Sequence, residues 1–356
     1  MGIELIKPET NINFMGKRKV AAFLSITLIL IGIISIIVKG GLNYGIDFAG
    51  GINIQVKFAQ PLEVKEIKKA LKNAHLKGLR VQRFGQKNLN QYLLRAGVSE
   101  EQPEIIRHRV ADCLKKLKVP FEIQRLEMVG PKIGSELKNK ALEALFYAVL
   151  LISIYISGRF EQKWGTAAIM AISLSTGVYI LKLLHMPVSI LIIAAIIITL
   201  VLCWYLKLNY ALGAVVALIH DVMITVGFFS LFNREFDLTV VAGLLTIIGY
   251  SLNDTIVIFD RIRENLRGPK KKKPLFDIIN ESINQTLSRT LLTSGTTLLV
   301  VLAMLLLGGG VIFNFALSLF IGIIVGTYSS IYIASSILLG IGPTPEKRSE
   351  KVHQPA

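Results

Sequence analysis

The chain has 356 residues, of which 52% are hydrophobic, with a mean hydropathy of +0.56 and a formal net charge of +16. A soluble core could not bury so large an apolar share, so the composition excludes an ordinary soluble domain and indicates a membrane protein. The basic excess does not indicate nucleic-acid binding, because no nucleic-acid-binding motif accompanies it.

Apolar runs long enough to cross a bilayer predict eight transmembrane helices. They cover residues 20–38, 144–158, 164–181, 186–206, 208–232, 238–259, 290–310 and 313–340. We interpret the first run as a retained anchor rather than a signal peptide, because no small-residue cleavage site follows it. The region from 141 to 342 is therefore expected to be a helical bundle.

Basic residues in the short connecting segments predict the orientation. If residues 1–19 are cytoplasmic, the inside segments hold 18 Lys and Arg, whereas the short outside loops hold only Lys182 and Arg234. Such an asymmetry is typical of the positive-inside rule. It predicts that both termini, 1–19 and 343–356, are cytoplasmic, with a basic cytoplasmic loop over 260–289.

Residues 39–140 form a long polar block that would lie outside the membrane. Alternating and helical periodicities predict the order β-α-β-β-α-β, the split βαβ pattern of a ferredoxin-like α+β domain, with a tight turn near Gly85–Asn88. The predicted strands are 51–58, 78–85, 88–97 and 120–130, and the predicted helices are 62–74 and 100–118.

A carboxylate interrupts the predicted helix 238–259. Asp254 precedes the first following basic residue, Arg261, by seven positions, which places it about 10 Å inside the membrane at the helical rise. Together with Thr246, Tyr250 and Asn253 it recurs mostly every three or four residues, which predicts a shared helix face. A charge at mid-membrane costs roughly 2.5–3.5 kcal/mol on insertion scales, so Asp254 needs a partner or a proton.

Two other predicted membrane segments also carry polar side chains. His220 and Asp221 lie in the helix 208–232, and Arg289 lies where the following basic loop meets its helix. Arg289 could form a static pair with Asp254 that holds two helices together, or it could take part in function. The pair His220–Asp221 is open to the same two interpretations.

The sequence contains no enzyme signature. It has no phosphate-binding P-loop, no zinc-protease HExxH and no GxSxG nucleophile motif. The five histidines lack the spacing of paired metal ligands. We therefore predict a protein that is not an enzyme, with no cofactor and no metal.

Four stretches carry a specific resemblance to a known family. They are LNYGIDFAGG (42–51), LGAVVALIHDV (212–222), FDLTVVAGLLTIIGYSLNDTIVIFDRIREN (236–265), and SRTLLTS with GTYSSIYIAS (288–294, 326–335). These stretches resemble the SecF family, membrane subunits of the bacterial Sec protein-export machinery that are similar to the proton-driven RND transporters. The resemblance covers most of the chain and includes an outside domain of the family's kind.

The resemblance implies that the protein lies in the inner (plasma) membrane beside the SecYEG channel. With SecD, it would use protons of the gradient to promote late steps of preprotein translocation. The matching positions assign a proton relay to Asp254, Arg289, Asp221 and Asn253, and motif positions to Gly45, Asp47, Gly50, Gly51 and His220.

One departure from the family pattern is the helix count, since the family has six helices and this chain is predicted to have eight. The family's RFE motif lies at 159–161, but the next motif begins only near Ala211, so one hairpin is inserted between them. Two alternatives stay open: an RND-like exporter of small molecules or lipids, and a translocon scaffold that transduces no energy, in which Asp254 only joins helices.

Overall fold

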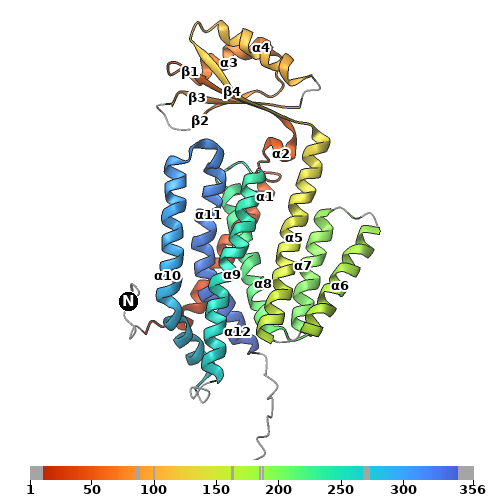
Figure 1. The fold of residues 1–356 in the computed structure, drawn as a ribbon, viewed down its shortest axis with the longest axis vertical. Coiled ribbons are helices and arrows are strands. Elements are labelled where there is room, and N and C mark those ends of the chain that lie inside the picture. The colour runs from red at the N-terminus through yellow and green to blue at the C-terminus, as the bar shows by residue number, and fades with distance from the viewer. Residues whose placement is uncertain are drawn as a thin grey trace, which may run out of the picture.

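The computed structural model describes residues 11–84, 89–98, 101–161, 164–183, 186, 188–267 and 273–343. Figure 1 shows a bundle of long helices with a small sheet domain at one end. The described chain begins and ends at the bundle end remote from the sheet. There Ile12 N–H donates to Asn284 Oδ1 on α10, and Asn209 Nδ2 on α8 donates to the Gly342 carbonyl.

Six stretches of helix in the described residues are long and apolar enough to cross a membrane. Many of their large apolar side chains face outward, as expected where lipid rather than water surrounds the helices. The long helices are α1 (Arg18–Val38), α5 (Pro131–Glu161), α8 (Asn209–Leu231), α9 (Leu238–Arg267), α10 (Leu275–Leu307) and α11 (Gly309–Ser329), which continues through a π-helical turn (Ser330–Ala334) into α12 (Ser335–Ile341).

The predicted extra hairpin is present as α6 (Trp164–Leu183) and α7 (Val188–Tyr205). Figure 1 shows the hairpin at one side of the bundle, where α7 packs on α5 and α8. The stretch Ile190–Tyr205 is apolar but shorter than the six spanning stretches. The number of spans that the structure supports in the described residues is therefore six, and eight stays a prediction.

The sheet domain has the predicted order of strands and helices. Its four strands form one sheet in the order β2-β3-β1-β4, and each neighbouring pair is antiparallel. The predicted turn at 85–88 lies outside the described residues. The elements are β1 (Gly51–Phe58), α3 (Val64–Ala70), β2 (Arg80–Phe84), β3 (Gln91–Ala96), α4 (Pro103–Lys115) and β4 (Phe121–Val129).

The two faces of this sheet differ in chemistry because successive side chains of a strand point to opposite faces. Ile52, Ile54 and Val56 of β1 are buried in a core with residues of α3 and α4, which cover the far face (Figure 1). The intervening residues, including Asn53 and Gln55, lie on the face toward the bundle. A polar sheet face is thus directed at the nearer ends of the membrane helices.

Two predicted boundaries differ from the structure because polar helix extends beyond the apolar runs. The helix α5 begins at Pro131, directly after β4, rather than near residue 141, and proline suits the first turn of a helix. The predicted cytoplasmic loop 260–289 is mostly helical extension of α9 and α10, whereas residues 268–272, with most of the lysine run, lie outside the described residues. Apolar residues of these extensions, such as Ile262 and Ile279, are buried.

Candidate functional site

Asp221 lies in the centre of a polar cluster inside the bundle. Its side chain has no exposure to solvent. Oδ1 is 2.9 Å from Nδ1 of the neighbouring His220, and Oδ2 accepts hydrogen bonds from Ser251 Oγ at 2.6 Å and from Ser329 Oγ at 2.9 Å. Side chains of α8, α9 and α11 therefore meet at this one carboxylate.

The cluster continues from His220 to the first helix. His220 Nε2 lies 2.9 Å from Ser25 Oγ on α1, and that hydroxyl lies 3.0 Å from the Tyr328 hydroxyl on α11. Tyr328 donates in turn to the Ala21 carbonyl at 2.6 Å, and its ring stacks on the His220 ring with 6.0 Å between centroids. Each hydroxyl in this hydrogen-bonded series can both donate and accept, so the series of hydrogen bonds is continuous.

Asp254, on α9, has a different environment. It is 3% exposed, and its Oδ2 accepts a hydrogen bond of 3.1 Å from Ser294 Oγ on α10. Ser294 accepts a 2.7 Å bond from Thr327 Oγ1 on α11. In the described residues, no other hydrogen bond reaches the Asp254 carboxylate. Asp254 is thus held by a single hydroxyl, whereas Asp221 has three partners.

The structure separates the predicted partners of Asp254. Arg289 is exposed, and within the described chain no ion pair joins it to Asp254, although its charge lies near enough to attract the carboxylate. Asn253 is exposed as well and lines a groove of about 550 Å³ together with Arg289, Arg159 and Asp260. The four residues predicted to share a face differ in burial: Asp254 is buried, Tyr250 is half-buried and donates to Thr297, and Thr246 and Asn253 are exposed.

Sequence reasoning missed the hydroxyl residues that hold the two carboxylates or extend their clusters. Most of them lie in the stretches SRTLLTS and GTYSSIYIAS, and Ser251 lies in the stretch 236–265, so the motifs contained a signal that hydropathy alone did not show; Ser25 lies in none of the four stretches. The π-helical turn that directly follows Ser329 is a second signal, since such turns are frequent at functional sites. The missed residues are Ser25, Ser251, Ser294, Thr327, Tyr328 and Ser329.

The glycine motif after α1 joins the bundle to the sheet domain. Gly45 N–H donates to the Phe236 carbonyl at 2.9 Å, and the Asp47 carboxylate accepts from the backbone N–H of Leu238 at the start of α9. Gly50 and Gly51 have φ of +72° and +135°, and a Cβ on Gly51 would lie 2.6 Å from the Ala96 carbonyl oxygen. Only glycine fits both this backbone conformation and this space.

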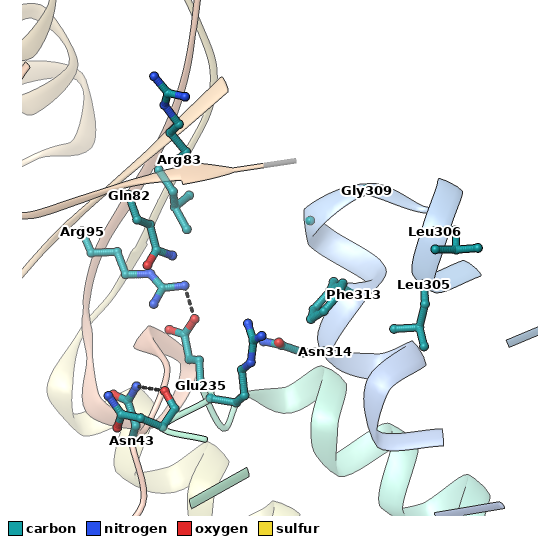
Figure 2. Close-up of a pocket in the computed structure, with 14 residues that line it drawn as sticks. Asn43, Gln82, Arg83, Arg95, Glu235, Leu305, Leu306, Gly309, Phe313 and Asn314 are labelled. Atoms are coloured by element: carbon teal, nitrogen blue, oxygen red, sulfur yellow. Dashed lines mark hydrogen bonds and ion pairs between the residues drawn. The ribbon is translucent and has the colours of Figure 1, made fainter. Parts of the chain in front are cut away.

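A second contact between the domain and the bundle is an ion pair. Arg95 on β3 pairs with Glu235 in the connection between α8 and α9, as Figure 2 shows. Burial raises the pKa of Glu235, while the charge of Arg95 opposes that rise; the nearby carboxylates Asp237 and Asp47 raise it further. The sheet is therefore tied to the helices by a partly buried ion pair whose carboxyl group has a raised pKa.

The structure offers no metal centre among the described residues, because no three His, Cys, Asp or Glu side chains there are grouped to hold an ion. Cys113 and Cys203 are buried, and no disulfide joins them. The chemistry of the bundle is accordingly that of buried carboxylates, an imidazole and hydroxyls.

Comparison with known proteins relates this arrangement to a family. The family model described as "Protein export membrane protein SecD/SecF, C-terminal" matches residues 109–200 and 181–343, and the "SecD/SecF GG Motif" model matches residues 34–62. The protein translocase subunit SecF of Calditerrivibrio nitroreducens is 42% identical over 342 residues, which cover 94% of this chain and 96% of that protein. The chain belongs to the SecF family.

Other SecF relatives agree with this assignment. SecF of Vibrio alginolyticus is 39% identical, with 95% of this chain and 92% of that protein covered. SecF of Escherichia coli O157:H7 is 36% identical, with 88% and 83% covered. SecF proteins are translocase subunits rather than enzymes, so this chain is a membrane component of protein export.

Solved SecDF structures share the fold. The crystal structure of SecDF, a translocon-associated membrane protein from Thermus thermophilus, matches with a TM-score of 0.68 and 29% identity. SecDF in its super-membrane-facing form matches with a TM-score of 0.56, also at 29% identity. The chain spans 39% of the length of each of these SecDF chains, with 94% and 95% of this chain covered.

Proposed function

We propose that this SecF-family chain acts with SecD beside SecYEG and uses the proton gradient to promote late steps of preprotein translocation. The observation that carries the proposal is Asp254, a buried carboxylate inside a membrane helix that is held by one hydroxyl and lies near a fixed positive charge. Charged groups inside membrane segments commonly mark proton pathways. SecDF from Thermus thermophilus is described as translocon-associated, which supports the same role.

The mechanism follows from the contacts of Asp254. When its carboxylate is charged, it attracts Arg289 on α10 and accepts from Ser294 on the same helix. Arginine stays protonated, so adding a proton to Asp254 removes the attraction and leaves α9 and α10 free to shift. One charge crossing the membrane is worth about 2.3 kcal/mol per 100 mV, comparable to the insertion cost of a carboxylate, so the gradient can bias this change.

Asp221, Asn253 and His220 take different parts in this proposal. Asp221 and His220 form the structured hydrogen-bond network that connects α1, α8, α9 and α11, and Asp221 stores or relays a proton through Ser251 or Ser329. Asn253 lines the groove with Arg289, through which water would supply protons from the cytoplasmic side. Both clusters share α9 and α11, so a shift of either helix changes both.

We also propose a topology with both termini cytoplasmic, eight spans and a ferredoxin-like domain outside. The described ends of the chain lie at the same end of the bundle, which fits an even number of spans. Cysteine labelling from outside should modify positions in the sheet domain and leave positions near Arg159 and Arg267 unlabelled. Labelling of those two positions from outside would refute the topology.

Two other functions compete with the proposal. An RND-like exporter of small molecules or lipids would act without SecYEG, and a scaffold would support export equally with and without a gradient. The decisive assay measures preprotein translocation into vesicles that contain SecYEG and SecD, with and without this chain. We expect the chain to increase the rate only when a proton gradient is present. A gradient-independent increase would support the scaffold, and no effect would support the exporter.

A further inference from the structure

A polar cleft separates the sheet from the outer ends of the bundle. Its larger part, of about 450 Å³, is drawn in Figure 2, and an adjoining part measures about 240 Å³. The two parts share lining residues from three places in the chain: Leu93 and Arg95 on β3, Glu235 after α8, and Gly310 and Asn314 on α11. The cleft therefore exists only where the domain and the helices come together.

Two side chains in the cleft carry buried polar atoms without a partner. Asn53 on β1 and Arg95 on β3 are direct cross-strand neighbours on the sheet face toward the bundle. Asn53 Oδ1 and Arg95 Nε are buried and make no hydrogen bond. Asn53 uses its other amide atom toward Glu127, and Arg95 uses Nη2 toward Glu235. The unpaired acceptor and the unpaired donor thus belong to directly paired residues of two strands, both of which line the cleft.

This pairing suits a ligand that offers one donor and one acceptor close together. Buried polar groups in proteins are normally satisfied, so each exception calls for a partner. A peptide group has that chemistry, with an N–H for Asn53 Oδ1 and a carbonyl for Arg95 Nε. It is also uncharged, which fits a cleft that contains both arginines, such as Arg125, and carboxylates, such as Asp237.

The larger part of the cleft adds an apolar wall next to these groups. Leu305, Leu306 and Phe313, from the ends of α10 and α11, face it together with Leu93 of the sheet. An extended polypeptide presents main-chain polar groups along its length and side chains to either side. Its main chain would meet Asn53 and Arg95 while an apolar side chain meets this wall.

We propose that the cleft between the sheet and the bundle is a binding site for an extended, unfolded polypeptide, which it recognises through the main chain at Asn53 and Arg95. The inference rests on the proposed function in one respect, namely that the occupant in the cell is the chain being exported. Recognition of the main chain would make the site tolerant of sequence, because every exported segment carries the same peptide groups.

The test measures binding of a fluorescent, unstructured peptide with one leucine among glycines and serines to the full chain in lipid nanodiscs. A matched set of peptides replaces one amide N–H at a time by an ester oxygen. For the unmodified chain, we expect one ester position to weaken binding by roughly three- to tenfold, the effect of one lost hydrogen bond. For Asn53→Leu, binding of the amide peptide should fall by the same factor, and that ester should have no further effect.

The matched control is Asn73→Leu, the same change at an exposed position on the opposite side of the domain. It should bind like the unmodified chain and keep the full ester effect. The ester series on the unmodified chain does not depend on any variant folding. Absence of peptide binding, or an ester effect that is equal in Asn53→Leu and the unmodified chain, would overturn the proposal.

A second measurement separates this inference from the proposed function. A photo-crosslinking residue at Leu93 should capture a preprotein that is stalled during translocation, and one at exposed Ile105 on α4 should not. Peptide binding together with preprotein capture but without gradient-stimulated export would retain the site and refute proton coupling. Capture of SecD instead of the preprotein at Leu93 would refute the site as a preprotein site.

Discussion

The two buried aspartates show how strongly the role of a residue depends on its immediate partners. Asp221 is satisfied by an imidazole and two serines, whereas Asp254 has one serine and a more distant arginine. A carboxylate with several fixed partners is tied to one geometry, and one with a single partner can change charge at less structural cost. The contrast therefore supports the proposal that protonation of Asp254, rather than of Asp221, alters the packing of helices.

Glu235 provides a pH prediction outside the membrane. Because burial raises its folded pKa above the usual 4.5, the folded chain holds this proton more tightly than the unfolded chain. Its contribution to stability is fully present below pH 4.5 and is lost as pH rises through the raised pKa. The loss is about 1.4 kcal/mol for each pH unit that separates the folded pKa from the unfolded pKa. As pH rises between these two pKa values, the melting temperature of the unmodified chain should therefore fall relative to that of Glu235→Gln. A difference that stays constant or grows with pH would contradict this.

At the scale of elements, small residues decide how closely the helices approach. A Cβ on Gly32 of α1 would lie 2.8 Å from the Gly227 Cα of α8, and one on Gly326 of α11 would lie 2.8 Å from Ser251 Cβ of α9. Such contacts are typical of membrane helices, where small residues permit close packing. Because Ser251 donates to Asp221, the close approach of α11 and α9 also fixes the polar cluster.

Gly32→Ala should destabilise the bundle, because the added methyl meets backbone that cannot rotate away. Overpacking of this kind costs roughly 1–3 kcal/mol. The measurement is thermal unfolding in detergent, with Gly249→Ala as control, since a Cβ on Gly249 meets nothing within 4 Å. Equal melting temperatures for the two variants would show that α1 and α8 do not pack as described.

The hairpin of α6 and α7 should be dispensable for proton coupling. None of the described side chains that bond to Asp221 or Asp254 comes from it, and it packs on the outer side of α5 and α8. Deleting about residues 160–210 and rejoining the chain at the inside loop should leave partial gradient-stimulated export. Complete loss of export from a chain that still inserts into the membrane would show that the hairpin is essential.

At the scale of the whole molecule, local sequence pattern predicted the helices and strands better than the tertiary contacts between them. The strands of the outer domain and the apolar helices follow from periodicity, which local sequence contains. The exposed position of Asn253 and the serine partners of the aspartates depend on which helices pack together, and hydropathy does not encode that. The early start of α5 at Pro131 was hidden because its first turns are polar. The cleft beneath the sheet likewise exists only in the assembled molecule.

The sheet domain should fold without the bundle. Its core is formed within the domain by residues such as Ile54, Leu71, Leu94 and Leu114, all nearly inaccessible to solvent. A fragment of residues 40–135 should therefore be soluble and show cooperative thermal unfolding by circular dichroism. A fragment with no folded baseline would show that the domain depends on its contacts with the helices, such as Arg95–Glu235.

The most direct test of proton coupling is the effect of Asp254→Asn on gradient-driven export. The substitution keeps the size of the side chain and an acceptor for Ser294, but it removes the group that can change charge. The control is Asp277→Asn on α10, where the carboxylate is exposed and does not line the groove beside Arg289. Translocation into vesicles with SecYEG and SecD is measured with and without a proton gradient. We expect Asp254→Asn to lose the stimulation and Asp277→Asn to retain most of it; full stimulation in Asp254→Asn would contradict proton coupling through this carboxylate.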